Sequence, residues 1–156
     1  TRKESSAASD VYKRQTVSIS TAPTDHRPVD PTIAFRFDYQ ESSVVVAGDT
    51  VPCTDLDQLC NGAKALVHTA IRKDIIETLP LQRAKDILNY HSSVEEAAQT
   101  AQRAGMEMLI LTHYVPGIPP AENEFHELVV QQWRDRAAEN FSGKVEIGDD
   151  LLKISL

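Results

Sequence analysis

The sequence of 156 residues lacks any apolar run approaching the roughly 18 residues that a membrane-spanning helix needs. It also lacks a charged-then-apolar signal peptide at its start. Cysteine is scarce, since only Cys53 and Cys60 are present, and their spacing fits neither C-x-x-C nor a usual zinc motif. We therefore expect no membrane segment and two reduced thiols. The compartment stays unknown, with the cytoplasm weakly favoured.

Positive charge is also in short supply, because 16 lysines and arginines stand against 23 acidic residues, for a net charge of −7. This balance disfavours non-specific adhesion to nucleic acid or to an anionic membrane, although it does not exclude a local basic patch. Hydrophobic residues make up 41% of the chain. That share is enough for a packed core in one domain of ordinary size.

The first fifteen residues, TRKESSAASDVYKRQ, are polar and without periodicity, whereas strand-like alternation begins abruptly at TVSIST. The string DVYKRQ back-translates naturally to the end sequence of a transposon-based sequencing adapter. We therefore interpret residues 1–15 as a structureless, adapter-derived tail, with a disordered natural tail as the alternative. On this interpretation, residues 16–156 are the C-terminal portion of a longer protein.

Strand and helix patterns alternate along the rest of the chain, which indicates an α/β or layered α+β domain. Residues 93–96 (SVEE) form a capping box and predict a helix that runs to Ala104. Residues 143–156 (GKVEIGDDLLKISL) predict a closing hairpin around the turn GDD. We expect strands over 16–21, 32–39, 43–47, 64–68 and 106–114, a proline-rich loop over 22–31, a short helix capped by Thr54, and helices over about 80–89 and 122–139.

Polar side chains follow the apolar strands at the points where those strands end. Asp49 follows VVVAG, His68 follows KALV and His113 follows LILT. His26 lies in the proline-rich loop, and His91 lies just before a helix start. Strand ends at one edge of an α/β sheet open into the binding crevice. Imidazoles together with a carboxylate that can bridge two ions are the ligands that a zinc site needs.

Each of these residues also has an ordinary structural interpretation, which the sequence leaves open. His26 can be a surface histidine, Asp49 a turn residue that bonds its own backbone, and His113 a satisfied core histidine. His68 fits an orienting or structural role better than a ligand role. His126, with glutamates as its neighbours on a helix, fits a solvated position.

Taken in order, these segments resemble the C-terminal half of a metallo-β-lactamase-fold hydrolase. TDHRPVDPTIAFRFDYQESSVVVAGDT is similar to the stretch of that superfamily in which a ligand histidine precedes a hairpin ending in GDT. LILTHY resembles its last ligand segment. NYHSSVEEAAQTAQRAG is similar to the HST-containing element of the ribonuclease Z and arylsulfatase-like branch, and FSGKVEIGDDLLKISL resembles the closing strands of that branch.

The resemblance implies a layered α+β fold, the αββα sandwich of the metallo-β-lactamases. This chain would be an incomplete half of it, a mixed sheet with helices on one face and a C-terminal hairpin. The resemblance also implies two Zn²⁺ ions, although such ligands accept iron or manganese as well. His26 would bind one ion, Asp49 would bridge both, and His113 would bind the second. His91 would be the general acid that protonates a leaving oxygen.

Neighbouring residues receive supporting roles under the same resemblance. Thr50 and His68 are expected to orient the site residues. Tyr114 and Pro116 are expected to belong to a loop beside the substrate. The full-length parent is expected to be a homodimer without membrane contact.

Two departures from the family pattern matter. The H-x-H-x-D-H motif, which supplies most ligands and the water-activating aspartate, is absent, and three protein ligands cannot fill two zinc coordination shells. The chain alone is therefore expected to bind metal poorly, to be inactive and to expose an apolar sheet face. In addition, Thr69 stands after His68 where the branch usually has glutamate, so what orients His91 stays open.

Three functions follow from these observations. The first is a fragment of a dinuclear metal-dependent hydrolase in which metal-bound hydroxide attacks a small-molecule ester, phosphodiester or sulfate ester. The alternative is a ribonuclease Z-type endonuclease that processes tRNA 3′ ends. HSS and GDT support it, whereas the acidic charge and the loop VPGIPP, which lacks a basic residue, weigh against a nucleic acid. A second alternative is a non-catalytic α/β binding domain with incidental histidines.

Overall fold

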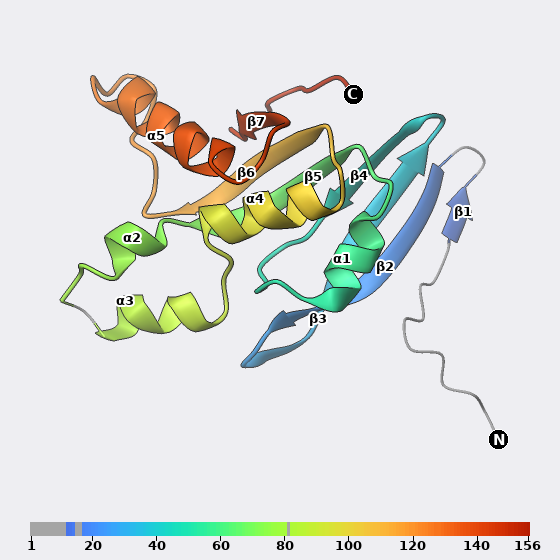
Figure 1. Cartoon of the computed structure of the whole chain (residues 1–156), viewed down its shortest axis with the longest axis horizontal. Coiled ribbons are helices and arrows are strands. Elements are labelled where there is room, and N and C mark those ends of the chain that lie inside the picture. The colour runs from blue at the N-terminus through green and yellow to red at the C-terminus, as the bar shows by residue number, and fades with distance from the viewer. Residues whose placement is uncertain (1–11, 15–16, 81) are drawn as a thin grey trace.

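The computed structural model describes residues 12–14, 17–80 and 82–156, and its centre is one mixed β-sheet whose strand order follows the chain (Figure 1). The first four strands are antiparallel neighbours, and the last four run parallel. The strands are β1 (Tyr12–Arg14), β2 (Val17–His26), β3 (Val29–Tyr39), β4 (Ser42–Val46), β5 (Ala65–Ile71), β6 (Met108–Val115) and β7 (Lys144–Ile147).

Helices cover one face of this sheet, as the sequence predicts (Figure 1). Parallel neighbours need a crossover, and α1 (Thr54–Cys60), α4 (Val94–Arg103) and α5 (His126–Ala138) lie in the three crossovers. The capping box of α4 is formed by Ser93 and Glu96. Thr54 is the first residue of α1 rather than its cap, a position that Cys53 occupies without a side-chain hydrogen bond.

An excursion between β5 and α4 extends past the edge of the sheet (Figure 1). It contains α2 (Lys73–Ile76), α3 (Gln82–Asp86) and the 3₁₀ helix η1 (Ile87–Asn89). The last two agree with the helix predicted over about 80–89. Because η1 ends directly before Tyr90 and His91, the excursion returns the chain to the carboxyl ends of the parallel strands.

The main core lies between the sheet and its helices. Leu66 of β5 and Leu109 and Leu111 of β6 are fully buried beneath α4 and α5. Trp133 of α5 is 1% exposed, and its ring meets the ring of Tyr114 edge-on with centroids 5.3 Å apart. Burial of one such large side chain stabilises the fold by about 2–3 kcal/mol, so this layer fixes the strands that carry the polar residues.

The opposite sheet face is apolar and largely open, in agreement with the sequence-based expectation. Ile33, Phe35, Phe37 and Tyr39 alternate along β3 and are between 37% and 49% exposed. The rings of Phe35 and Phe37 stack with centroids 6.3 Å apart. A contiguous apolar surface of this kind marks an interaction site rather than a solvated face.

The predicted C-terminal hairpin is wrong. β7 pairs in parallel with β6, and residues 152–156 form no strand in the part of the chain that the structure describes. Instead, Ile154 packs against Ala65, Met108 and Ile110 on the face opposite the helices. The alternation in LLKISL therefore serves to place apolar side chains on the sheet rather than to pair a strand with β7.

Two further predictions fail near the N-terminus. Residues 22–31 are not a loop, because β2 and β3 continue as a two-stranded ribbon beyond their neighbours β1 and β4. Pro23 and Pro31 are tolerated there because each lies on a free edge. Tyr12–Arg14 form β1, although the tail was expected to lack structure; residues 1–11 and 15 lie outside the described residues.

The described residues contain no helix that could cross a membrane.

Candidate metal centre

Asp49 is delivered by the end of a buried strand. Val45 and Ala47 are buried, and Gly48 then turns the chain with a φ of 68°. That left-handed conformation is accessible to glycine without strain. The hydroxyl of Thr69, at the end of the neighbouring β5, donates to the Gly48 carbonyl at 2.9 Å. The turn therefore projects the Asp49 carboxylate beyond the sheet edge at a fixed position.

His26 and His91 approach Asp49 from two other segments, the end of β2 and the residues after η1. One ligand atom from each of these three residues lies within 4.8 Å of the others. The two imidazole rings meet edge-on with centroids 4.9 Å apart. The geometry thus gathers a His–Asp–His set of the kind that holds a divalent metal ion.

His113 completes the cluster from β6. Its Nε2 lies 3.5 Å from Oδ2 of Asp49, and its side chain is 56% exposed. Its φ of 51° is a conformation that non-glycine residues rarely adopt. Strain of this kind is found preferentially at functional sites. All four residues singled out in the sequence as ligands or general acid therefore meet at one point, and their individual roles stay predictions.

Backbone carbonyls fix the orientation of two of the imidazoles. Nδ1 of His26 lies 2.7 Å from the Tyr90 carbonyl oxygen, and Nδ1 of His91 lies 3.0 Å from that of Ile87. A carbonyl can only accept, so Nδ1 carries the proton in both rings. In the neutral ring of His91, Nε2 then presents its lone pair toward Asp49, as in the outer-shell arrangement of metal-bound histidines.

The electrostatics of the cluster favour a cation. Burial lowers the pKa of His91, whose side chain is only 10% exposed. Oδ1 of Asp49 is buried and has no hydrogen-bond partner in the described part of the chain. A buried carboxylate oxygen without a donor is costly. A divalent metal ion supplies the missing partner, so the donor set and the orphaned oxygen both fit such an ion.

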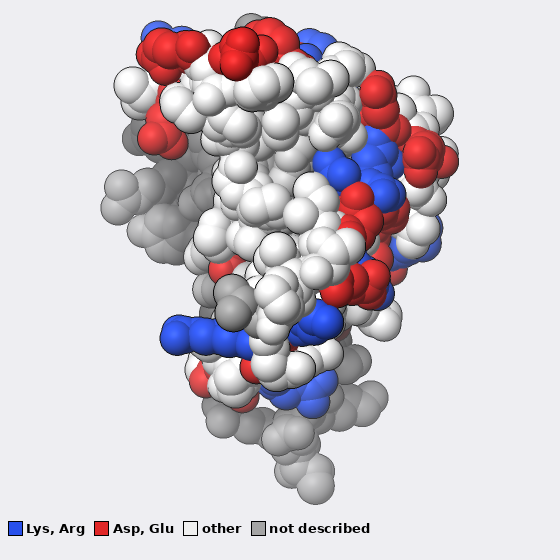
Figure 2. Space-filling view, turned by 90° about the vertical axis from the view of Figure 1, so that its left-hand side faces the viewer, with Lys and Arg blue, Asp and Glu red and all other residues white. Residues whose placement is uncertain are grey.

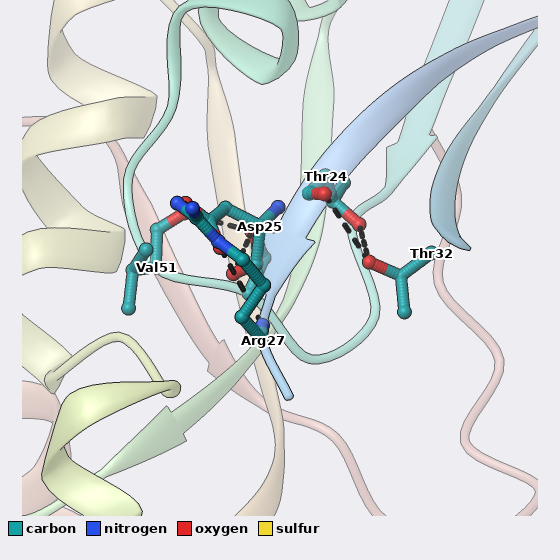
Figure 3. Close-up of polar contacts among 6 residues, drawn as sticks. Thr24, Asp25, Arg27, Thr32 and Val51 are labelled. Atoms are coloured by element: carbon teal, nitrogen blue, oxygen red, sulfur yellow. Dashed lines mark hydrogen bonds and ion pairs between the residues drawn. The ribbon is translucent and has the colours of Figure 1, made fainter. Parts of the chain in front are cut away.

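Thr50 lies at the centre of the contacts that hold these segments together. It is fully buried, and its Oγ1 accepts a hydrogen bond from the Asp25 amide at 3.0 Å. Val51 extends the contact, since its amide donates to the Asp25 carbonyl at 2.9 Å (Figure 3). The hydroxyl of Ser92 donates to the Thr50 carbonyl at 2.8 Å. An orienting role for Thr50 stays a prediction that this geometry supports.

His68 and the substrate-loop candidates lie outside the cluster. His68 is fully buried within β5, its Nδ1 contacts the Thr69 carbonyl, and burial lowers its pKa. Tyr114 bonds through its hydroxyl to the Gly148 carbonyl at 2.8 Å, and burial raises its pKa to about 12. These contacts hold the Tyr114 side chain against Gly148, and its place beside the substrate stays a prediction. Pro116 is exposed beyond the end of β6.

Two contacts in this region are not signalled by the sequence. The departure at Thr69 left the orientation of His91 open, and the Ile87 carbonyl supplies the acceptor that holds its ring. A backbone acceptor has no side-chain signature, so no motif indicates it. His126, expected to be solvated, is half-buried, and its Nδ1 lies 2.7 Å from the Pro119 carbonyl.

Curated relatives are similar across nearly the whole sequence. Ribonuclease Z of Mycobacterium avium (strain 104) is 58% identical over 146 residues, which are 94% of this chain and 50% of that protein. A putative ribonuclease Z of Mycobacterium tuberculosis (strain CDC 1551 / Oshkosh) is 56% identical over 149 residues, which are 96% of this chain and 63% of that protein. The chain thus spans about half the length of the curated relatives it matches.

Solved structures give the same fold. The metallo-β-lactamase fold protein YhfI from Bacillus subtilis aligns with a TM-score of 0.65 at 22% identity, over 90% of this chain and 49% of that one. The short form of human tRNase Z aligns with a TM-score of 0.59 at 20% identity, over 92% of this chain and 44% of that one. Residues 8–114 match the family described as "Beta-lactamase superfamily domain". The chain therefore belongs to the metallo-β-lactamase superfamily.

Proposed function

We propose that this chain is the C-terminal part of a ribonuclease Z-type, metal-dependent phosphodiesterase that cleaves precursor tRNA. The observation that carries the proposal is the convergence of His26, Asp49, His91 and His113 on one point. The ribonuclease Z names of relatives 56–58% identical support this alternative over the small-molecule hydrolase that the sequence alone ranked first.

His26, Asp49 and His113 are the proposed ligands of two divalent ions, with Zn²⁺ as the first choice. When bound, the ions supply Lewis-acid chemistry that polarises the phosphoryl group and activates water. His91 is proposed to move the proton of the leaving oxygen. Its Nδ1 proton is committed to the Ile87 carbonyl, so His91 would deliver a proton from Nε2, the atom that faces Asp49, only after Nε2 has itself taken one up.

Residues 16–156 are proposed to need a complementary half. Three ligands cannot complete two metal sites, the β3 side of the sheet exposes apolar residues, and the curated relatives are about twice as long as the matched region. An apolar-faced partner sheet would cover the open face and supply the remaining ligands. The adapter origin of residues 1–15 is part of the same proposal.

The charge distribution favours tRNA contacts from that complementary half. On the side shown in Figure 2, residues other than Lys, Arg, Asp and Glu make up most of the surface, and the charged ones are of both signs. The chain as a whole carries −7. Backbone phosphates require lysines and arginines. The same charge balance keeps a small-molecule phosphodiester or ester as the second candidate substrate.

The test is to join this chain to the N-terminal half of the Mycobacterium avium relative. Metal content, cleavage of precursor tRNA and cleavage of bis(p-nitrophenyl) phosphate are measured on the joined protein. The proposal expects about two metal ions per chain and tRNA cleavage that falls as salt rises. Cleavage of the small diester alone would favour the second candidate, and absence of both activities with metal bound would refute hydrolysis.

Asp49→Ala in the joined protein should abolish metal content and cleavage together. The matched control is Asp57→Ala, because Asp57 pairs with Arg103 at a partly exposed position on α1. That variant should keep both properties. Retention of full metal content by Asp49→Ala would show that the ligand assignment is wrong.

A further inference from the structure

Ser92 connects two segments of the metal centre. Its hydroxyl donates to the Thr50 carbonyl at 2.8 Å, and both residues are fully buried. Thr50 directly follows Asp49, and Ser92 directly follows His91. The hydrogen bond therefore joins the positions next to the two side chains that face each other, with His91 Nε2 3.8 Å from Asp49 Oδ2.

The same Thr50 holds the third segment. Its Oγ1 accepts from the Asp25 amide, and Val51 and Asp25 form an isolated bridge (Figure 3). Asp25 directly precedes His26. Each of the three segments is thus hydrogen-bonded at a residue next to His26, Asp49 or His91. Thr50 takes part in both connections, to Asp25 and to Ser92.

The backbone of Ser92 is fixed independently of its hydroxyl. Its carbonyl accepts a hydrogen bond from the Ile71 amide at 3.0 Å, which anchors it to the end of β5. Ser93, the next residue, is the N-cap of α4. The segment is therefore held by the sheet on one side and by the helix after it, and the Ser92 hydroxyl is its contact toward Thr50.

We infer that Ser92 is a positioning residue that sets the separation of His91 from Asp49 by holding the Thr50 carbonyl. The inference rests on the proposed function, in which His91 moves a proton beside a metal held by Asp49. A buried hydroxyl on a short side chain with one acceptor has little freedom. Misplacement of a reacting group by about 1 Å can cost a hundredfold in rate, so such a tether matters.

The test compares ring-proton cross-relaxation in the metal-free chain with that in variants, at a pH well above the ordinary histidine pKa of about 6.5. The reporter is the His26–His91 pair, whose ring centroids lie 4.9 Å apart. The reference is the Tyr114–Trp133 pair at 5.3 Å, which lies in the main core. Ser92→Ala should weaken the first cross-peak and leave the second unchanged. Ser92→Thr should restore the first, because its hydroxyl can make the same bond.

Ser93→Ala is the matched control, since it removes a neighbouring buried hydroxyl that caps α4 without touching Thr50. It should lower stability yet keep the His26–His91 cross-peak. If Ser92→Ala does not fold, Ser92→Cys replaces it in the test. A thiol is a weak donor of similar size, so this variant should reduce the His26–His91 cross-peak.

Full His26–His91 intensity in Ser92→Ala, or in Ser92→Cys where that variant carries the test, would overturn the inference, as would its loss in Ser93→Ala. A wild-type chain without this cross-peak would overturn the geometry from which the inference starts. The readout uses neither metal nor substrate. A failure of the proposed function would instead appear as a joined protein that lacks tRNA cleavage while the cross-peaks behave as expected.

Discussion

Nε2 of His91 lies 3.8 Å from Oδ2 of Asp49, and burial lowers the pKa of His91, which favours its neutral ring. The Nδ1 proton of His91 is held by the Ile87 carbonyl, so Nε2 presents a lone pair to the carboxylate. Two acceptors that face each other in a mostly buried place repel unless positive charge lies beside them, either as a metal ion held by Asp49 or as a proton on Nε2 of His91. This pairing is the physical reason to regard the cluster as a metal centre rather than as a set of satisfied polar residues.

Asp49→Asn should raise the stability of the metal-free chain and lower that of the metal-loaded joined protein. An amide offers an N–H donor to the neighbouring Nε2 lone pair, and it removes the buried charge. We expect a gain of about 1 kcal/mol without metal, the lower end of the cost of an unsatisfied buried acceptor. Urea unfolding with and without zinc measures both effects. A loss of stability in both conditions would contradict the acceptor–acceptor interpretation.

Gly48→Ala should destabilise the chain by about 1–2 kcal/mol through backbone strain alone. The φ of Gly48 is 68°, and a Cβ at this position would meet no atom within 4 Å, so there is no steric contribution. Gly117→Ala has equally open surroundings without that φ and should be near neutral. Thermal unfolding of the two variants measures the difference, and equal costs would count against a strained turn before Asp49.

Stability should fall in mild acid because of His68. Burial holds the folded-state pKa of His68 below its ordinary value of about 6.5. As the pH falls below about 6.5, His68 takes up a proton in the unfolded chain but stays neutral in the folded chain. The contribution of neutral His68 to the free energy of unfolding is therefore fully present above that pH and is lost below it. His68→Gln should flatten the slope of the unfolding free energy between about pH 6.5 and 5.

The control for this slope is His126→Gln, which removes a histidine that is only half-buried and far along the chain in α5. Equal flattening in His126→Gln would show that the effect is not specific to His68. A wild-type slope retained in His68→Gln would contradict the assignment of the acid sensitivity to that ring.

The open sheet face should make the isolated chain associate with itself and bind apolar dyes. Replacement of Phe35 and Phe37 by lysine should reduce both, because these stacked rings lie at the centre of the exposed β3 surface. Leu128→Lys alters an apolar side chain that is 58% exposed on α5, and it should change neither. Sedimentation and dye fluorescence measure the effect, and equal behaviour of the two variants would contradict a specific docking face.

The sequence was sufficient to predict the part of the site that depends on strand order. Asp49 follows β4 and His113 lies near the end of β6, and parallel strands bring their carboxyl ends to one edge. It was not sufficient for the strand that carries His26, because three nearby prolines favoured a loop, whereas the ribbon of β2 and β3 accommodates Pro23 and Pro31 on free edges.

Other features could not be predicted because they depend on the tertiary environment. The acceptors that orient His26 and His91 are the carbonyls of Tyr90 and Ile87, which every residue type possesses. The alternation in residues 152–156 is equally compatible with a paired strand and with apolar side chains laid on a sheet. Ile154 packs its apolar side chain on the sheet, because the sheet face beneath it is otherwise open.

The most direct measurement is the metal content of four alanine variants of the joined protein, at positions 26, 49, 91 and 113. His26→Ala, Asp49→Ala and His113→Ala should each lose metal. His91→Ala should keep it while tRNA cleavage falls by about 10²–10⁴-fold, the usual worth of a general acid. Loss of metal from His91→Ala to the same extent as from His26→Ala would contradict the account, because His91 would then be a ligand and not the proton donor.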